Sequence, residues 1–360
     1  MKTKMKRWMT GWMLFALALG SGCGRSGPGE EAAGDGILVF TYWEEYFPLE
    51  VLETFTEETG IVVEYAGYSS EDEVTEEILA GVRYDVAILP IEQIPRLIRG
   101  GAVHPLDYAN LPNFKYVSAN FRDLVFDPGN RYSVPFRWGT TGLLVREDLV
   151  PFAVTRWADL WDPRLEGRVA FWSISRTMLP IALKRLGHSV NTTDPEALEA
   201  ALDLLITLKA SGTMITGSEE TIVPELTEGE AWVAVGWAYD AIVAREEGWD
   251  SIAFILPEEG TILWGEQLVV PAASGDREGA ERFINFLLRP DIAARLVNES
   301  GYAAPHDGIE ALVHPEILAS PISYPPNEKL MKAELTMPLG EAGDALFDSV
   351  WERFLSAPGK

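Results

Sequence analysis

Apolar runs alternate with amphipathic stretches along the first third of the folded part of the chain. The pattern predicts a strand over 37–43, a helix over 48–59, a strand over 61–68, a helix over 70–81 and a strand over 85–89. Such alternation is typical of parallel βαβ units. In these units ligands gather at the carboxyl ends of the strands. The residues that follow each strand are therefore the first candidates for a site.

A second set of elements follows from residue 157 onward. In order, the pattern predicts a strand over 168–172, helices over 178–186 and 195–209, a strand over 231–237 that leads into a helix from Tyr239, a strand over 267–271 and a helix over 277–288. About 320 of the 360 residues belong to this folded part, which is enough for two full cores. We therefore expect two α/β lobes of similar size.

The first 22 residues have the layout of a secretory signal peptide. Four basic residues precede an apolar run over 8–19, which is shorter than the roughly 20 residues that span a bilayer. Small residues then precede Cys23, as at the site where bacteria attach lipid to a new N-terminal cysteine. We expect 1–22 to be removed and Cys23 to be lipidated. The alternative, favoured by Gly20 where leucine is usual, is an ordinary signal peptide with an incidental cysteine.

Residues 23–36 are expected to form a flexible tether between the lipid and the folded part. After Cys23 this segment is rich in glycine and glutamate and nearly free of large apolar side chains, so it cannot bury itself. The folded part should begin near Ile37. Because Cys23 is the only cysteine, the chain forms no intramolecular disulfide and packing alone must stabilise it.

The net charge favours a cationic ligand. The full chain carries a formal charge of −26, and without the four basic residues of the signal segment 25 Lys and Arg face 55 Asp and Glu. Such a field repels nucleic acid and attracts cations. An acidic surface also keeps a protein in solution, so the charge by itself supports a cationic solute without identifying one. We expect no nucleic-acid partner.

Sequence signatures of enzymes are sparse. The four histidines do not form the i, i+4 pair of a zinc helix. There is no phosphate-cradling loop and no Gly-x-Ser-x-Gly elbow. We therefore expect no metal, no cofactor and no catalysis. Paired carboxylates of a glycoside hydrolase cannot be recognised from spacing, so a surface hydrolase stays as a less favoured alternative.

Aromatic residues stand beside acids at three expected strand ends. The three groups are Trp43-Glu44-Glu45-Tyr46, Trp237-Ala238-Tyr239-Asp240 and Trp264-Gly265-Glu266. Ring faces hold ammonium groups at ~0.5–2 kcal/mol each, and carboxylates accept charge-assisted hydrogen bonds worth ~1.5–3 kcal/mol. Taken singly, each tryptophan fits a core position, Asp240 fits a first-turn acid of a helix and Glu266 fits a solvated residue. Taken together, the three groups predict a cation site.

Six stretches of sequence carry a further set of motifs. They are TYWEEYFP (41–48), SVPFRWGTTGLLV (133–145), TRWADLWDPRLEGRVAF (155–171), LGHSVNTTDPEALEAA (186–201), INFLLRPDIA (284–293) and GYAAPH (301–306). Over nearly the whole mature chain these motifs resemble the spermidine/putrescine-binding proteins of bacterial ABC importers. The resemblance implies a two-lobed periplasmic binding protein fold of type II, with mixed sheets flanked by helices and a ligand cleft between the lobes.

The resemblance also implies which residues hold the ligand. They are Trp43, Glu45, Tyr46, Trp237, Asp240, Trp264, Glu266 and Tyr302. Ile91, Gln93 and Thr336 depart from the family pattern, and Ile174 and Thr177 stand where the family usually has acids. Losing one carboxylate partner costs ~1.5–3 kcal/mol, which is roughly ten- to a hundredfold in affinity. These departures disfavour spermidine relative to a diamine or monoamine.

The implied lobes are discontinuous in sequence. Lobe 1 should comprise 37–139 and 265–306, and lobe 2 should comprise 140–264 and 307–360. We expect a monomeric lipoprotein in the periplasmic space or at the cell surface. It would capture a small cationic amine such as putrescine or spermidine and deliver it to an ABC transporter permease. The alternative is a sensory or scaffold lipoprotein of the same fold that binds a different small solute.

Overall fold

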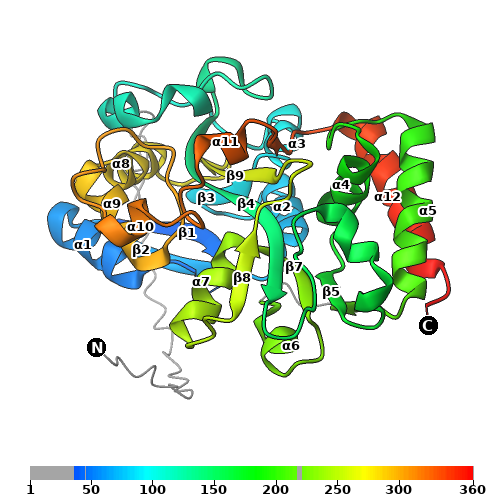
Figure 1. Cartoon of the computed structure of the whole chain (residues 1–360). Helices are drawn as coiled ribbons and strands as arrows, with labels where there is room; N and C mark the ends of the chain where they lie inside the picture. Colours follow the sequence, from blue (N-terminus) through cyan, green and yellow to red (C-terminus); the bar gives the residue numbers. More distant parts are fainter. Residues whose placement is uncertain (1–35, 45, 217–220, 360) are drawn as a thin grey trace, which may run out of the picture. The chain divides into compact units, whose positions relative to one another are not determined.

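The computed structural model describes residues 36–44, 46–216 and 221–359, and within them strands and helices alternate (Figure 1). The strands are β1 (Ile37–Trp43), β2 (Val62–Tyr68), β3 (Val86–Pro90), β4 (Ser133–Arg146), β5 (Val169–Trp172), β6 (Met214–Thr216), β7 (Val233–Trp237), β8 (Ile252–Ile255), β9 (Ile262–Val269) and β10 (Glu334–Leu335). The α-helices are α1 (Leu49–Thr59), α2 (Glu71–Leu79), α3 (Ile94–Arg99), α4 (Ser175–Leu186), α5 (Pro195–Ala210), α6 (Val223–Thr227), α7 (Ala238–Glu246), α8 (Arg277–Leu287), α9 (Pro290–Ser300), α10 (Pro315–Leu318), α11 (Asn327–Leu330) and α12 (Gly340–Ser356). Short 3-10 turns are η1 (Pro112–Tyr116), η2 (Ala119–Phe121), η3 (Pro128–Asn130), η4 (Trp157–Trp161) and η5 (Pro163–Leu165). The predicted signal peptide, Cys23 and nearly all of the tether lie outside the described residues.

The strands form one hydrogen-bonded mixed sheet. Its main path runs β2-β1-β3-β9-β4-β7-β5-β6, with β10 beside β9 and β8 beside β4. β1 pairs in parallel with β2 and β3, which confirms the predicted βαβ units, and β5 pairs in parallel with β6 and β7. β9 runs antiparallel to β3 and β4. The α/β class is therefore confirmed, with a sheet of mixed direction.

Local sequence explains several element boundaries. α1 ends at Gly60, whose φ of 76° is left-handed and whose N–H donates to the carbonyl of Thr56. α2 begins after Ser70, whose Oγ accepts a hydrogen bond from the N–H of Glu73, as the capping-box pattern predicts. Pro290 is the first residue of α9, where its missing N–H costs nothing. It therefore follows the end of α8 and at the same time begins the next helix.

Two boundaries differ from the prediction by three residues or more. β9 begins at Ile262, five residues before the predicted strand, because its first half pairs with β4 although it contains polar and glycine positions that hide the apolar pattern. α4 begins at Ser175 rather than Met178, since its first turn faces a cavity instead of the core and so lacks apolar residues. Both errors fall on segments that line the candidate site.

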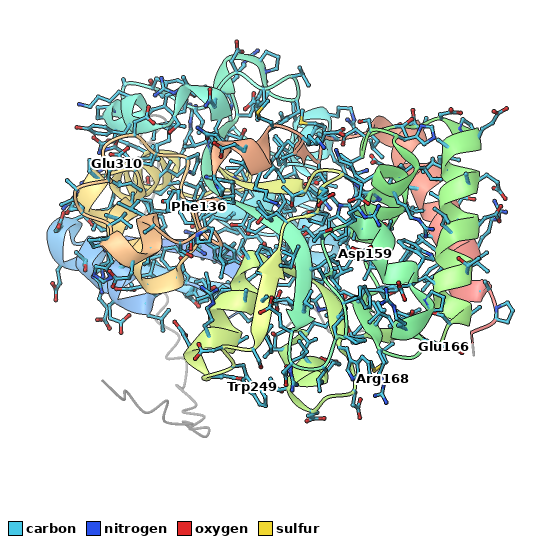
Figure 2. The ribbon with its side chains drawn as sticks, viewed as in Figure 1. Phe136, Asp159, Glu166, Arg168, Trp249 and Glu310 are labelled. Atoms are coloured by element: carbon cyan, nitrogen blue, oxygen red, sulfur yellow. The ribbon has the colours of Figure 1, made fainter. Side chains whose placement is uncertain are left out.

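Apolar side chains gather in two large clusters. The first draws on segments 38–136 and 268–296, and the second draws on segments 143–262 and 347–354. Figure 2 shows side chains filling the space between the sheet and its helices, with Phe136 of β4 belonging to the first cluster. On the second cluster's side α4, α5 and α12 pack together (Figure 1). The chain passes from the first cluster to the second along β4 and returns along β9.

β4 and β9 lie side by side where the chain passes between the clusters. Arg137 pairs with Glu266, Trp138 with Gly265 and Gly139 with Trp264, after a bulge at Pro135 to Arg137. We call this paired segment, 137–141 with 262–266, the crossing. It contains the two expected lobe boundaries, between 139 and 140 and between 264 and 265. Its side chains lead directly to the candidate site.

Candidate functional site

A cavity of about 450 Å³ opens at the carboxyl ends of β1, β3, β5 and β7, beside the crossing. The first turns of α2 and α4 and part of α12 complete its wall. Its aromatic lining consists of Tyr42, Trp43, Tyr46, Trp237, Trp264, Tyr302 and Trp351. Its acidic lining consists of Glu71, Asp72, Glu92, Glu266 and Asp348. The location is the one expected for ligands of α/β sheets.

The structure brings together six of the eight predicted ligand residues. These are Trp43, Tyr46, Trp237, Trp264, Glu266 and Tyr302, all of which line this cavity. Glu45 lies outside the described residues. Asp240 is described but does not line the cavity. The aromatic groups of the three sequence motifs thus converge on one space, whereas one of their acids does not reach it.

Tyr46, Tyr239, Tyr302 and Trp264 form one connected aromatic group, and Trp237 forms a separate pair with Trp172. Tyr239 lies 5.3 Å from Tyr46 and 5.3 Å from Tyr302 between ring centroids, and the rings of Tyr239 and Tyr302 stack at 14°. Trp264 meets Tyr302 edge-on at 5.3 Å, and Trp237 lies 4.3 Å from Trp172. Tyr239 was not predicted as a site residue, although it stands inside the quoted motif. It links the ring of Tyr46 to that of Tyr302.

Glu266 is the buried carboxylate of the cavity. The hydroxyl of Tyr42 lies 2.7 Å and 2.9 Å from its two oxygens, and Nη1 of Arg137 donates to the same hydroxyl at 3.3 Å. Burial raises the pKa of Glu266, while the charge of Arg137 and the Tyr42 hydrogen bond oppose that rise. Burial lowers the pKa of Arg137, but the interactions with Tyr42 and Glu266 outweigh it and leave that pKa raised. Glu266 therefore presents an ionisable carboxylate next to ring faces.

Tyr42 and Arg137 were missed as site residues. Burial raises the pKa of Tyr42 well above its usual value, so its hydroxyl stays protonated and can donate to Glu266. Arg137 is nearly fully buried, and its Nη2 has no hydrogen-bond partner among the described residues. No local pattern marks these residues, because 137 and 266 come to lie opposite each other only through the pairing of β4 with β9.

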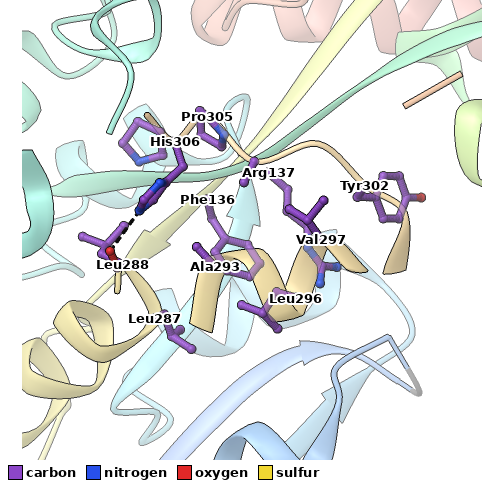
Figure 3. A pocket seen from close by; sticks show the side chains of 12 residues that line it. Phe136, Arg137, Leu287, Leu288, Ala293, Leu296, Val297, Tyr302, Pro305 and His306 are labelled. Atoms are coloured by element: carbon purple, nitrogen blue, oxygen red, sulfur yellow. Dashed lines mark hydrogen bonds between the residues drawn. The ribbon is translucent and has the colours of Figure 1, made fainter. Parts of the chain in front are cut away.

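A second, much smaller cavity of about 20 Å³ lies behind the crossing (Figure 3). Arg137 and Tyr302 line it together with apolar residues of α9, and Tyr302 therefore lines both cavities. The Nε2 atom of His306 lies 3.0 Å from the carbonyl oxygen of Leu288 beside it. A space of this size holds about one water molecule. It is too small for an amine ligand.

Asp240 serves the start of α7. Its Oδ2 accepts a hydrogen bond from the N–H of Trp237 at 2.8 Å, and its Oδ1 accepts from Thr221 Oγ1 at 3.0 Å and from the N–H of Ile222 at 3.5 Å. Only 1% of Asp240 is exposed, and burial raises its pKa to about 6. The Asp240 carboxylate thus accepts its hydrogen bonds from two backbone N–H groups and one hydroxyl near the cavity wall. This geometry favours positioning of Trp237 over the direct ligand contact expected from the sequence.

The start of α4 forms another part of the cavity wall. Ile174 and Thr177, which replace the acids usual in the resembled family, both line the cavity here. Arg176 lies between them and also lines it. Burial lowers the pKa of Arg176, and the charges of Glu92, Asp344 and Asp348 oppose that shift. Sequence reasoning noted the two replacements but missed Arg176.

Two further findings bear on function. Within 36–44, 46–216 and 221–359, no helix combines the length and apolar character needed to cross a membrane. Over the same ranges, no group of three or more His, Cys, Asp or Glu is arranged to hold a metal ion. The chemistry of the described cavity wall is therefore that of aromatic rings, carboxylates, hydroxyls and one guanidinium.

Comparisons with known proteins agree with this geometry. Residues 50–323 match a family model described as bacterial extracellular solute-binding protein. The spermidine/putrescine-binding periplasmic protein of Escherichia coli K12 is 33% identical over 353 residues, which cover 97% of this chain and 99% of that protein. A putrescine-binding periplasmic protein of Pseudomonas aeruginosa is 30% identical, with 93% and 94% covered. A solved spermidine/putrescine ABC transporter substrate-binding protein of Streptococcus pneumoniae superposes with a TM-score of 0.79 at 27% identity, covering 89% of this chain and 98% of that one.

Proposed function

Because this chain belongs to the spermidine/putrescine-binding periplasmic protein family of bacterial extracellular solute-binding proteins, we propose that it captures a polyamine or a related amine in the 450 Å³ cavity. It then delivers the amine to an ABC transporter permease. The family is one of binding proteins, so no catalytic step is assigned. The names of the relatives supply the ligand class, and the cavity supplies side chains that suit it.

The observation that carries the proposal is the buried Glu266 among aromatic rings. An alkylammonium needs a carboxylate for its charge and ring faces for its charge and its methylenes. Glu266 offers the carboxylate, and the ring faces come from Trp43, Trp237 and Trp264. We assign ligand contact to these residues together with Glu45, Tyr46 and Tyr302. Asp240 acts through Trp237, whose N–H it binds.

We further propose that the chain forms the two lobes of a type II periplasmic binding protein. Lobe 1 comprises 37–139 and 265–306, and lobe 2 comprises 140–264 and 307–360. The two apolar clusters support this division, since the chain passes between them along β4 and β9. Bending at the crossing would close the lobes on the amine, which neither lobe alone could remove from water.

The proposed place of action is the outer face of a bacterial membrane. Periplasmic or extracellular location follows from the family, and the lipid anchor rests on the sequence around Cys23. The protein would act as a monomer. Replacing Cys23 with Ser should release the mature protein from the membrane fraction of expressing cells, while Ser21→Ala should leave it membrane-bound. Retention of Cys23→Ser in the membrane fraction would rule out Cys23 as the anchor.

Thermal unfolding of the mature chain with putrescine, spermidine and spermine tests the ligand class. An amine present at about 100 times its dissociation constant should add ~2.7 kcal/mol to the free energy of unfolding. Succinate and glucose, which carry no amine, serve as controls that should give no change. If none of the three amines changes the unfolding midpoint, a polyamine receptor is excluded, and a lipoprotein of the same fold that binds a different small solute becomes the better assignment.

A further inference from the structure

The start of α4 gives the cavity a second end whose chemistry differs from that around Glu266. Among the described residues that line the cavity, Arg176 is the only one with a basic side chain. Ser173, Ser175 and Thr177 line the same wall and supply hydroxyl groups. This part of the wall therefore combines a guanidinium with neutral donors, while the acids Glu92 and Asp348 line the cavity nearby.

The donors of Arg176 are largely unused. Nη2 donates to the carbonyl of Met337 at 2.8 Å, and the guanidinium lies 4.9 Å from the ring centroid of Phe347. Nε and Nη1 are buried and have no hydrogen-bond partner among the described residues. Buried polar groups in folded proteins are nearly always hydrogen-bonded, and a buried charge even more so. An acceptor for these donors is therefore missing from the described protein.

The neighbouring acids do not supply that acceptor. The charges of Glu92, Asp344 and Asp348 favour the protonated form of Arg176. None of the three forms an ion pair with it within 4 Å in the described residues, so each acts from a distance. Ile174 and Thr177 stand where the resembled family usually carries acids, and neither side chain is a carboxylate. Among the described residues, Arg176 therefore stands at this wall without a carboxylate in direct contact.

The backbone of α4 adds a second anion-attracting group. α4 is 12 residues long, and its first turn lies at the cavity. The residue before it, Ile174, makes no side-chain hydrogen bond to cap the free N–H groups. Uncapped N–H groups and the helix dipole attract anions at such a position. Arg176 and the helix start thus favour the same kind of ligand group.

We propose that the ligand carries an ammonium group at the Glu266 end and a carboxylate at the Arg176 end, as in an ω-amino acid or another amine that bears a carboxyl group. This inference rests on the proposed amine-binding function and narrows its ligand class. The carboxylate takes the place of the absent protein acids and accepts hydrogen bonds from Arg176. Because Nε and Nη1 are buried, the Arg176 side chain must rotate about its outer bonds to bring them to the cavity. This rotation replaces the hydrogen bond to the carbonyl of Met337 with hydrogen bonds to the ligand carboxylate.

A matched ligand series tests the proposal on the unaltered mature chain. Titration calorimetry would compare ω-amino acids of four to seven carbons with the α,ω-diamines of the same chain length and with the monoamines. At the best-fitting length the amino acid should bind roughly 10- to 100-fold more tightly than the monoamine, which is the usual value of a charge-assisted contact. It should also bind more tightly than the diamine. The proposal is overturned if the diamine binds more tightly than the amino acid at every length.

Substitutions assign the effect to Arg176. Arg176→Gln should weaken the best ω-amino acid roughly 10- to 100-fold and leave the monoamine within about threefold. Arg176→Lys keeps the charge and should retain part of the affinity, since a lysine cannot bind a carboxylate through two parallel bonds. The matched control is Arg185→Gln, because Arg185 lies on the same helix and over the ring of Trp161 but does not line the cavity.

The outcomes separate this inference from the proposed function. Tight diamine binding with weak amino acid binding overturns the carboxylate end and leaves the amine receptor intact. Binding of neither class overturns both proposals. Equal loss of amino acid and monoamine affinity in Arg176→Gln, with intact folding by circular dichroism, also contradicts a specific contact with the carboxylate. Should Arg176→Gln fail to fold, Arg176→Lys and the ligand series decide the question.

Discussion

The first half of β9 and the start of α7 carry similar sequence, a tryptophan followed within three residues by an acid, yet their acids lie in different surroundings. At β9 both Trp264 and Glu266 line the cavity. At α7 Trp237 lines the cavity, whereas Asp240 binds backbone and hydroxyl groups behind its wall. The difference shows that the position of such an acid depends on whether the chain after the tryptophan continues as a strand or begins a helix.

The backbone geometry explains the difference. β9 continues as a strand through Glu266, so positions 264 and 266 point to the same side of the sheet. β7 ends at Trp237 and α7 begins at Ala238, so Asp240 becomes the third residue of a helix. A carboxylate at that position turns back to the free N–H of the residue before the helix. One pattern therefore presents its acid to the cavity and the other uses it to begin a helix.

The two carboxylates also differ in their charged neighbours. Glu266 is linked through Tyr42 to the cationic Arg137, which opposes the effect of burial on its pKa. The hydrogen bonds to Asp240 come from the neutral donors of Trp237, Thr221 and Ile222. Burial is then the largest influence on Asp240 and raises its pKa to about 6. The comparison predicts distinct responses to pH and to charge removal.

The largest expected effect is the pH dependence that Asp240 gives to stability. Its pKa rises from an ordinary 3.8 to about 6 on folding, so between these values the folded state binds more protons than the unfolded state. The free energy of unfolding should therefore fall by about 2 kcal/mol for this group as pH rises from 4 to 6, out of about 3 kcal/mol over its whole titration. Asp240→Asn lacks this term. Urea unfolding of both proteins from pH 4 to pH 7 measures the difference.

The comparison with Asp240→Asn isolates this group, because other titrating residues, Glu266 included, contribute to both proteins. The gap between the two stability curves should change with pH and become constant above pH 7. Parallel curves over the whole range would mean that Asp240 titrates at its ordinary value. The inferred effect of burial on the pKa of Asp240, and its contrast with Glu266, would then be contradicted.

Ligand affinity should separate the two acids by roughly ten- to a hundredfold. Glu266→Gln removes the carboxylate that faces the cavity and should cost ~1.5–3 kcal/mol of binding to the best amine. Asp240→Asn should change that affinity by less than about threefold, because its side chain lies behind the wall. Titration calorimetry at pH 7.5 measures both, with circular dichroism to confirm folding. A larger loss in Asp240→Asn than in Glu266→Gln would invert the assignment of the two acids.

How far the sequence could predict this site follows from the same geometry. Trp43, Trp264 and Glu266 were predictable because aromatic residues stand beside acids next to expected strands, although the strand that carries Trp264 and Glu266 begins five residues earlier than expected. The role of Asp240 depended on the residue at which β7 gives way to α7, and helix starts are poorly located by sequence pattern. The helix-dipole alternative considered for Asp240 is the one that the geometry favours.

Other parts of the site depended on long-range packing. The pairing of Arg137 with Glu266 joins segments 129 positions apart, and no local pattern encodes it. Arg176 was hidden by the apolar and hydroxyl residues around it, which indicated only that acids were absent. By contrast, the elements from β1 to β3 were predicted closely, because Gly60, Ser70 and the apolar alternation act within a few residues. Local signals locate elements, and contacts between distant strands complete the site.

Crowding at the crossing should give the next largest effect. A methyl group on Gly139 would lie 2.2 Å from Trp264 Cζ2, which is well inside contact distance. Gly139→Ala should therefore displace the Trp264 ring, lower the free energy of unfolding by about 1–3 kcal/mol and weaken amine binding. A methyl group on Gly265 would meet only the flexible end of Ile91 at 3.2 Å, so Gly265→Ala should cost less. Equal stability losses in urea unfolding would show that Trp264 is not held against Gly139.

The smallest predicted effect tests the contact that joins the two regions. Tyr239 of α7 stacks on Tyr302 at 14° and lies 5.3 Å from it, and Tyr302 in turn meets Trp264 of the crossing. Aromatic pairs contribute ~0.5–1.5 kcal/mol beyond the area they bury. Tyr239→Leu and Tyr302→Leu should therefore show a coupling energy of that size in a double-mutant cycle measured by urea unfolding.

A second cycle provides the control for this coupling. Tyr116 stacks on His306 rather than on Tyr239, so Tyr239→Leu and Tyr116→Leu should be additive within about 0.5 kcal/mol. Additivity in the first cycle as well would mean that the stacked rings are neighbours without energetic linkage. The start of α7 would then influence the crossing only through the backbone that Asp240 holds. A measured coupling would instead make Tyr239 the residue through which the two regions respond together to a bound amine.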